Sequence, residues 1–259
     1  MFGVILVLSS EGGKEMTNII EVQNLTKKYG NQTAVDNLSF EVKEGSVFGL
    51  LGSNGAGKSS TIECILGTKK IDEGKVSVLG IDPIKQRKTL FEQVGVQFQE
   101  AKYQDLIKVE ELCETTAVLY KNPKDYKALL QAFGIADKGK AYVKELSGGE
   151  RQRLFIVLAL IPNPKLVFLD ELTTGLDARA RRDVWKVLEQ LKEQGLSILL
   201  TSHFMDEVEV LCDEIGILKK GKLIFRGKVQ EAIEKSRCEK FEDAYLWFTD
   251  EEEVDYESL

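Results

Sequence analysis

The residues with the clearest potential for chemistry form a short glycine-rich segment that fits the pattern G-x-x-x-x-G-K-[ST]. It consists of Gly52, Ser53, Asn54, Gly55, Ala56, Gly57, Lys58 and Ser59. Its glycines allow the backbone to wrap around phosphate groups with its N–H groups pointing inward. Lys58 can neutralise β- and γ-phosphate charge, and the Ser59 hydroxyl can ligate Mg²⁺. The segment therefore predicts a site for a nucleotide and a magnesium ion.

Two acidic residues follow an apolar run later in the chain. The run Leu166–Leu169 is typical of a strand buried on both faces of a parallel sheet, and Asp170 and Glu171 come directly after it. Ligands bind at the carboxyl ends of such strands. We therefore expect Asp170 to hold Mg²⁺ through water and Glu171 to polarise an attacking water. Acids that merely begin a helix are the alternative interpretation, and the phosphate loop weighs against it.

A second glycine pair stands between these two segments. Ser147, Gly148 and Gly149 open a helical run that reaches Leu160. A helix that begins on glycines has free N–H groups at its N-terminus, and these can bind a phosphate. One chain then carries two half-sites. This arrangement predicts two copies that sandwich nucleotide between them.

The periodicity of the chain predicts its fold class. Strand patterns precede the phosphate loop, helical patterns fill residues 104–160, and strands and helices alternate afterwards. The expected strands are Ile19–Val22, Leu38–Val42, Val47–Leu51, Leu166–Leu169 and Ser197–Thr201; the expected helices are Val109–Tyr120, Tyr126–Phe133, Ala178–Gln194 and Phe204–Leu211. We expect an α/β fold of the P-loop NTPase type. It combines a mostly parallel sheet with an N-terminal antiparallel β subdomain and an inserted α-helical subdomain.

Composition excludes several classes of protein. The chain is 43% apolar and 30% charged, as in ordinary globular domains. Its longest early apolar run, Phe2–Leu8, has seven residues, whereas a membrane span needs roughly 20, so we expect a cytosolic location. The four cysteines are widely spaced and predict neither a zinc site nor disulfides.

The net charge of −7 is concentrated at the C-terminus. Residues 239–259 contain nine acids and one lysine, which leaves the rest of the chain at +1. The body therefore has no general preference for nucleic acid, and no nucleic-acid partner is expected.

Together these motifs resemble the nucleotide-binding subunit of ATP-binding cassette transporters over about Ile19 to Gly227. The stretch Leu146–Leu154 is similar to the family signature, and Thr173–Asp177 is similar to the loop that crosses the interface of the cassette dimer. Leu172 stands where the family usually has proline, and Ser53 and Ser60 replace a common proline and threonine. These departures affect the rigidity of the loops and remove no reacting group.

The resemblance implies further roles. Tyr29 would stack on adenine, and Ser60 and Asp177 would join the nucleotide site. Gln99 would contact Mg²⁺ and link the site to a membrane partner; Gln97, two residues earlier on the same strand, remains the alternative. His203, the only histidine in the chain, would contact the γ-phosphate. The resemblance thus implies ATP hydrolysis with Lys58, Glu171, Gln99 and His203 as catalytic residues, and Ser59, Gln99 and Asp170 as magnesium ligands.

The resemblance also sets the expected organisation and partners. Residues 1–18 form an N-terminal extension, residues 19–235 the ATPase domain with its helical subdomain at about 100–160, and residues 236–259 an acidic tail. Partners are ATP, a membrane permease subunit and a second cassette subunit, either identical or paralogous. The permease would dock beside the Gln99 loop and place the chain on the cytoplasmic face of the membrane.

A C-terminal stretch favours one branch of the family. Residues 241–249 resemble a short motif that follows the cassette in drug and polysaccharide exporters, although an ordinary amphipathic helix is the alternative interpretation. Export is therefore the preferred function. A soluble cassette protein that remodels a macromolecular complex is the rival, and it would be favoured by two cassettes in one chain. A regulator without turnover would be expected to lack Glu171 or His203, and both are present.

Overall fold

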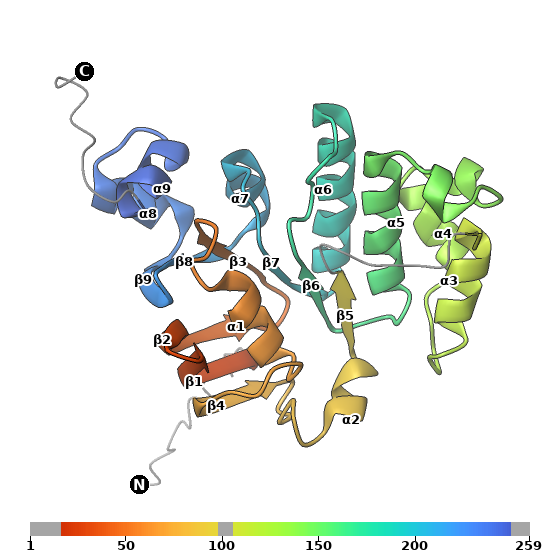
Figure 1. Cartoon of the computed structure of the whole chain (residues 1–259). Coiled ribbons are helices and arrows are strands. Elements are labelled where there is room, and N and C mark those ends of the chain that lie inside the picture. The colour runs from red at the N-terminus through yellow and green to blue at the C-terminus, as the bar shows by residue number, and fades with distance from the viewer. Residues whose placement is uncertain (1–16, 98–105, 250–259) are drawn as a thin grey trace, which may run out of the picture.

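The computed structural model describes residues 17–97 and 106–249 (Figure 1). The helical insert, drawn in green, lies on one side of the molecule, and the C-terminal helices, drawn in blue, lie on the other. Within the described ranges, no helix combines the length and the apolar character that a membrane crossing requires.

A six-stranded sheet forms the centre of the fold. Its strands run in the order β5-β6-β7-β3-β8-β9, and every neighbouring pair is parallel except β8 and β9. Their bounds are Val94–Gln97 (β5), Leu166–Leu169 (β6), Ser197–Leu200 (β7), Val47–Gly52 (β3), Glu214–Lys219 (β8) and Lys222–Gly227 (β9). The expected α/β fold with a mostly parallel sheet is confirmed.

The inner strands are apolar because both of their faces are covered. Along β6, Val167 and Leu169 pack into one hydrophobic cluster, whereas Leu166 and Phe168 pack into another. Successive side chains of a strand point to opposite faces, so this division places one cluster on each side of the sheet. All four residues of β6 are buried. The next residue, Asp170, is the first polar group after β6.

The expected antiparallel β subdomain is a three-stranded sheet in the order β2-β1-β4. Its strands are β1 (Asn18–Tyr29), β2 (Gln32–Lys43) and β4 (Glu73–Val78). β1 and β2 are much longer than the sequence pattern indicated, and β4 was not predicted. β4 begins with three exposed residues, so it shows little of the apolar alternation that reveals a half-buried strand.

The described part of the insert is helical, as expected. It contains α3 (Val109–Ala117), α4 (Tyr126–Ala132) and α5 (Gly148–Leu160), with two short 3₁₀ turns at Ala136–Lys138 and Val143–Glu145. The last seven residues of α5 are all buried. They belong to a hydrophobic cluster that also contains residues of α3, α4 and β6. This packing fixes α5 against the sheet.

Six further helices complete the described fold. They are α1 (Lys58–Ile65), α2 (Arg87–Phe91), α6 (Ala178–Glu193), α7 (Met205–Leu211), α8 (Val229–Ser236) and α9 (Phe241–Thr249). Part of the acidic C-terminal segment is thus folded. Phe241, Ala244 and Phe248 of α9 are buried in a cluster with residues of β8, because their spacing of three and four residues places them on one face of the helix.

Candidate active site

A cavity of about 660 Å³ opens where β3 ends and α1 begins. It is lined by the phosphate loop, by the turn between β1 and β2, and by the two acids after β6. The lining residues are Tyr29, Gln32, Thr33, Ala34, Asn54, Gly55, Gly57, Lys58, Ser59, Ser60, Asp170, Glu171 and Lys220. The structure therefore brings the phosphate loop, Tyr29 and both acids to one cavity.

The phosphate loop ends in a helix N-terminus that faces this cavity. Gly57 precedes α1 with a φ of +105° and has no side chain with which to cap the helix. A Cβ atom at this position would lie 2.5 Å from the carbonyl oxygen of Ala34, so both the backbone angle and the space require glycine. The first N–H groups of α1 therefore remain available. Together with the helix dipole they form an anion site suited to phosphate.

Lys58 is held by the loop itself. Its Nζ donates hydrogen bonds to the carbonyl oxygens of Gly52 at 2.6 Å and Ser53 at 3.2 Å. Burial lowers the pKa of Lys58, and the nearby Asp170 and Glu171 carboxylates oppose that change by favouring the charged form. The ammonium group is thus largely removed from water beside two acids. A phosphate group in the cavity would offer it stronger, charged acceptors.

Thr201, directly after β7, forms hydrogen bonds with both acids. Its hydroxyl donates to Asp170 Oδ1 at 2.5 Å and accepts from the backbone N–H of Glu171 at 2.9 Å. Thr201 is fully buried. The hydroxyl therefore fixes the side chain of one acid and the backbone of the next, at the point where the chain leaves β6.

Glu171 and His203 are in contact at the edge of the cavity. His203 Nε2 lies 3.6 Å from Glu171 Oε1, and their side chains are 39% and 20% exposed. Both groups are therefore accessible to a bound molecule and to water. Thr174 Oγ1 also donates to Glu171 Oε2, at 3.5 Å. The contact gives the single histidine of the chain a place beside the acid expected to polarise water.

The remaining predicted nucleotide contacts are placed as follows. Tyr29 is 43% exposed, so its ring is accessible to a stacking base. Lys27 Nζ lies over the ring, 5.1 Å from its centroid. Ser60 lines the cavity in the first turn of α1. Gly52 and Ser53 take part through the carbonyl groups that hold Lys58, and Ala56 is the buried side chain of the loop.

Sequence reasoning missed four lining residues, which are Gln32, Thr33, Ala34 and Lys220. The turn that contains Lys220 is attached to the phosphate loop, because Gly221 N donates to the carbonyl oxygen of Ala56 at 3.0 Å. The Lys-Lys-Gly-Lys turn is a visible signal for a basic loop. Its position beside the phosphate loop depends on the pairing of β8 with β3, which the local sequence does not reveal.

The segment that resembles the family signature, at the start of α5, lies outside this cavity. Ser147 caps α5: its hydroxyl accepts from Glu150 N at 3.2 Å, and its own N–H donates to Glu150 Oε2 at 2.9 Å. The Ser147 N–H bond, together with Lys138, lowers the pKa of Glu150 to about 2. Ser147, Gly148 and Gly149 are described by the structure, but they are not among the residues that line the cavity. They form a second, separate helix N-terminus.

The loop that ends in Asp177 accompanies this second helix N-terminus. A Cβ atom on Gly149 would lie 3.1 Å from Leu176 Cδ2 and 3.3 Å from Gly175 O, so α5 packs closely against the loop. Asp177 caps α6 by accepting from Arg179 N and Ala180 N, each at 2.9 Å. These hydrogen bonds, from Ala180 first, lower the pKa of Asp177. The start of α5 at Gly149 and the loop that ends in Asp177 therefore lie side by side.

The oxygen atoms at the cavity fit a magnesium ion that is shared with a nucleotide. Ser59 and Asp170 both line the cavity, and Mg²⁺ is usually held by one or two protein oxygens together with substrate phosphates. Within the described ranges, no group of three or more acidic, histidine or cysteine side chains could hold a metal alone. Gln99 lies outside the described residues. Gln97 is the buried last residue of β5.

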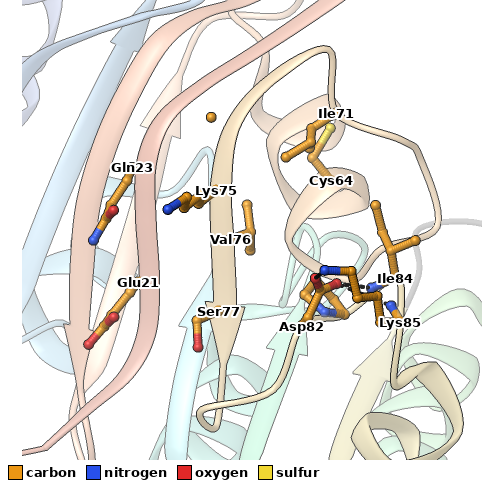
Figure 2. Close-up of a pocket in the computed structure, with 12 residues that line it drawn as sticks. Glu21, Gln23, Cys64, Ile71, Lys75, Val76, Ser77, Asp82, Ile84 and Lys85 are labelled. Carbon is orange, nitrogen blue, oxygen red and sulfur yellow. Dashed lines mark hydrogen bonds and ion pairs between the residues drawn. The ribbon is translucent and has the colours of Figure 1, made fainter.

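A second cavity, of about 410 Å³, has a different chemistry. It lies between β1, β4 and the turn that holds Asp82 (Figure 2). Asp82 already accepts hydrogen bonds from Ile84 N and Lys85 N at 3.0 and 3.1 Å, and it pairs with Lys85 Nζ at 3.3 Å. The lining of this second cavity includes no helix N-terminus and no part of the phosphate loop. The cavity beside Lys58 is therefore the better candidate for a nucleotide.

Known proteins share the fold and part of the sequence of this chain. The ABC transporter family model matches residues 35–174. The chain is similar to the Nod factor export ATP-binding protein I of Ralstonia nicotianae, with 39% identity over 84% of this chain and 69% of that protein. It is also similar to a linearmycin resistance ATP-binding protein of Bacillus subtilis, with 36% identity over 81% of this chain and 69% of that protein. A solved ATP-binding subunit of an ABC transporter superposes with a TM-score of 0.82 and 26% identity, covering 90% of this chain and 100% of that one.

The position of Thr201 generates a prediction. Thr201→Val removes the donor to Asp170 and leaves the backbone N–H of Glu171 without its acceptor, which should lower the free energy of unfolding by about 1–3 kcal/mol. Thr201→Ser keeps the hydroxyl and should retain most of the stability. Urea unfolding of both variants measures the difference. Equal stability of the two would contradict a bridging role for the hydroxyl.

Proposed function

The chain belongs to the ABC transporter family, and from this premise we propose that it hydrolyses ATP to power export through a separate membrane permease. One observation carries the hydrolytic part of the proposal. Lys58, Asp170 and Glu171 line one cavity, and His203 contacts Glu171 at its edge. In this proposal Lys58 is the cation that binds phosphate, and Asp170 is the carboxylate that binds metal. Glu171 is the carboxylate that orients the attacking water, and His203 is its partner.

In this mechanism the residues mainly bind and orient. The N–H groups at the start of α1 hold the phosphates, and Tyr29 stacks on the base. Lys58 exchanges its hydrogen bonds to the carbonyl groups of Gly52 and Ser53 for contacts with the phosphates. Ser59 and Asp170, with Gln99 as a further expected ligand, would hold Mg²⁺, which would supply positive charge next to the phosphates. Glu171 orients the attacking water, and His203 contacts the γ-phosphate. The residues lower the barrier by positioning the water and stabilising charge.

We further propose that each nucleotide is enclosed by two chains. The helix N-terminus at Ser147 is exposed and separate from the cavity of its own chain, which supports its use by a second chain. Ser147, Gly148 and Gly149 of one subunit would close the cavity of the other, and the Asp177 loop would cross between them. ATP then favours the closed pair, and hydrolysis separates it. The partner is an identical or a paralogous cassette.

Export is the direction that the relatives support. Two similar proteins are named for Nod factor export and linearmycin resistance, and α9 folds against the end of the cassette. In this proposal the permease supplies the transport path and contacts Gln99 and the helical insert, on the cytoplasmic face of the membrane. No nucleic-acid partner is proposed. The domain boundaries remain as proposed, at residues 18 and 235, with α9 a folded part of the C-terminal segment.

The place of Glu171 in the cavity generates a prediction about turnover. Glu171→Gln should bind ATP normally but lower turnover by about 10²–10⁴-fold, because the amide cannot accept a proton from water. It should also accumulate the closed pair, since ATP stays intact. ATPase assays together with size-exclusion chromatography in Mg-ATP measure both effects. Turnover near the parent rate would remove Glu171 from this role.

The two-chain site generates a mixing experiment. Ser147→Arg and Lys58→Ala should each be inactive alone, because each pair then carries its lesion in both sites. In a mixed pair, one site combines the intact Lys58 of one chain with the intact Ser147 of the other. Mixing the two inactive proteins should therefore restore part of the ATPase activity. A Ser147→Arg protein that is fully active alone would exclude the shared site.

Association with a permease separates a transport motor from a soluble remodelling ATPase. The tagged protein, purified from native membranes in mild detergent, is expected to bring with it a protein that contains several membrane-spanning helices. Mass spectrometry of the complex identifies that protein. Recovery of the chain only from the soluble fraction, bound to a macromolecular complex, would favour the remodelling function instead.

A further inference from the structure

Gln152 connects the helix of the signature segment to the acid that the mechanism uses. It lies on α5, five residues after Ser147, and its side chain is half-buried. Its Nε2 donates hydrogen bonds to two consecutive carbonyl oxygens, those of Glu171 at 3.2 Å and Leu172 at 2.8 Å. One amide group therefore spans the backbone that follows the two acids.

The backbone at Glu171 needs such support. Its φ is +52°, in the left-handed region, which costs a residue with a Cβ atom on the order of 1–3 kcal/mol. Strained residues persist where surrounding contacts determine their conformation. Here the N–H of Glu171 donates to Thr201 Oγ1, and the N–H of Leu172 donates to the Thr201 carbonyl at 3.4 Å. The two carbonyl groups are held from the other side by Gln152, and the Glu171 carbonyl also accepts from Thr174 N at 3.2 Å.

The left-handed turn determines where the Glu171 carboxylate points. A change of φ at this residue would rotate the Cα–Cβ bond and move the carboxylate relative to the cavity and His203. The Thr201 contacts fix only the N–H side of the turn. On the carbonyl side, Thr174 N holds the carbonyl of Glu171, and Gln152, from a different part of the fold, holds the carbonyls of both Glu171 and Leu172. Loss of this restraint would therefore displace the carboxylate without removing any reacting group.

From these contacts we propose that Gln152 is a positioning residue for water activation, which holds the turn at Glu171 so that its carboxylate faces the cavity. This inference rests on the proposed role of Glu171 in hydrolysis. It adds a connection between the two half-sites of one chain. The N-terminus of α5 serves the nucleotide on the partner, whereas Glu171 serves the nucleotide of its own chain, and Gln152 joins them.

Two substitutions separate the hydrogen bonds from packing. Gln152→Met keeps a long flexible side chain but removes both donors, and it should lower kcat by about tenfold to a hundredfold. Gln152→Glu has nearly the same shape as glutamine but places acceptor oxygens against two carbonyl groups, so it should lower kcat further. Neither variant should change the nucleotide Kd, because the phosphate loop is untouched. A role in packing alone would leave the two variants close to the parent rate.

Gln131 offers a matched control. It is an exposed glutamine on α4, in the same helical subdomain, so Gln131→Leu should leave kcat and nucleotide affinity unchanged. Far-UV circular dichroism and thermal unfolding of all variants establish that they are folded. Comparison of the Gln152 and Gln131 variants then isolates the two hydrogen bonds to the turn.

His203 reports the position of Glu171 without any turnover. It is the only histidine in the chain and lies 3.6 Å from the Glu171 carboxylate, so its imidazole ¹⁵N signals require no assignment. In nucleotide-free protein, these signals should shift in Gln152→Met and Gln152→Glu and stay in place in Gln131→Leu. Glu171→Gln gives the reference shift for a change at the contact itself.

The outcomes distinguish this inference from the proposed function. If the parent protein hydrolyses ATP and Gln152→Met has the parent kcat, Gln152 is not a positioning residue. Unchanged His203 signals in a folded Gln152→Met protein overturn the inference in the same way. A parent protein without ATPase activity overturns the proposed function, and the His203 signals alone then decide whether Gln152 positions Glu171.

Discussion

Parallel pairing of β6, β7 and β3 is the constraint on which the site depends. Leu169 of β6 is aligned with Leu200 of β7, and Gly49 of β3 is aligned with the same Leu200. The three strands therefore end at one edge of the sheet, where the chain continues into Asp170, Thr201 and the phosphate loop. A shift of one residue in this register would exchange the two faces of a strand and separate Thr201 from the acids.

The electrostatics of the cavity follow from this convergence. Lys58 is mostly buried beside Asp170 and Glu171, yet its direct partners in the protein are neutral carbonyl groups. Burial of a charge is costly unless charged or well-aligned polar groups compensate for it. The arrangement thus favours arrival of an anion, which can bind both Lys58 and the free N–H groups of α1. The nearby acids in turn favour a bound cation, which explains why nucleotide and metal fit the same cavity.

α5 links the packing of the core to the chemistry at its surface. Its last seven residues are buried among the helices of the insert and the sheet, while its first turn is partly exposed and capped by Ser147 and Glu150. Gln152 lies at the transition between these parts and contacts the turn after β6. A helix anchored at one end can transmit a contact at the other because its backbone hydrogen bonds make it stiff. This geometry gives Ser147, at the start of α5, a defined position relative to Glu171.

The sequence alone determined the features that depend on local pattern. The phosphate loop, the apolar strand before Asp170 and the helical insert could be predicted because spacing and periodicity reflect nearby backbone geometry. β4 could not, since its first residues are exposed and carry little apolar alternation. The left-handed backbone of Glu171 was also hidden, because it is imposed on an ordinary residue by its surroundings. Lys220 joins the cavity, and Gln152 reaches two carbonyl groups about twenty residues away, only through strand pairing and helix packing. Contacts between distant segments have no local signature, so only the tertiary structure decided them.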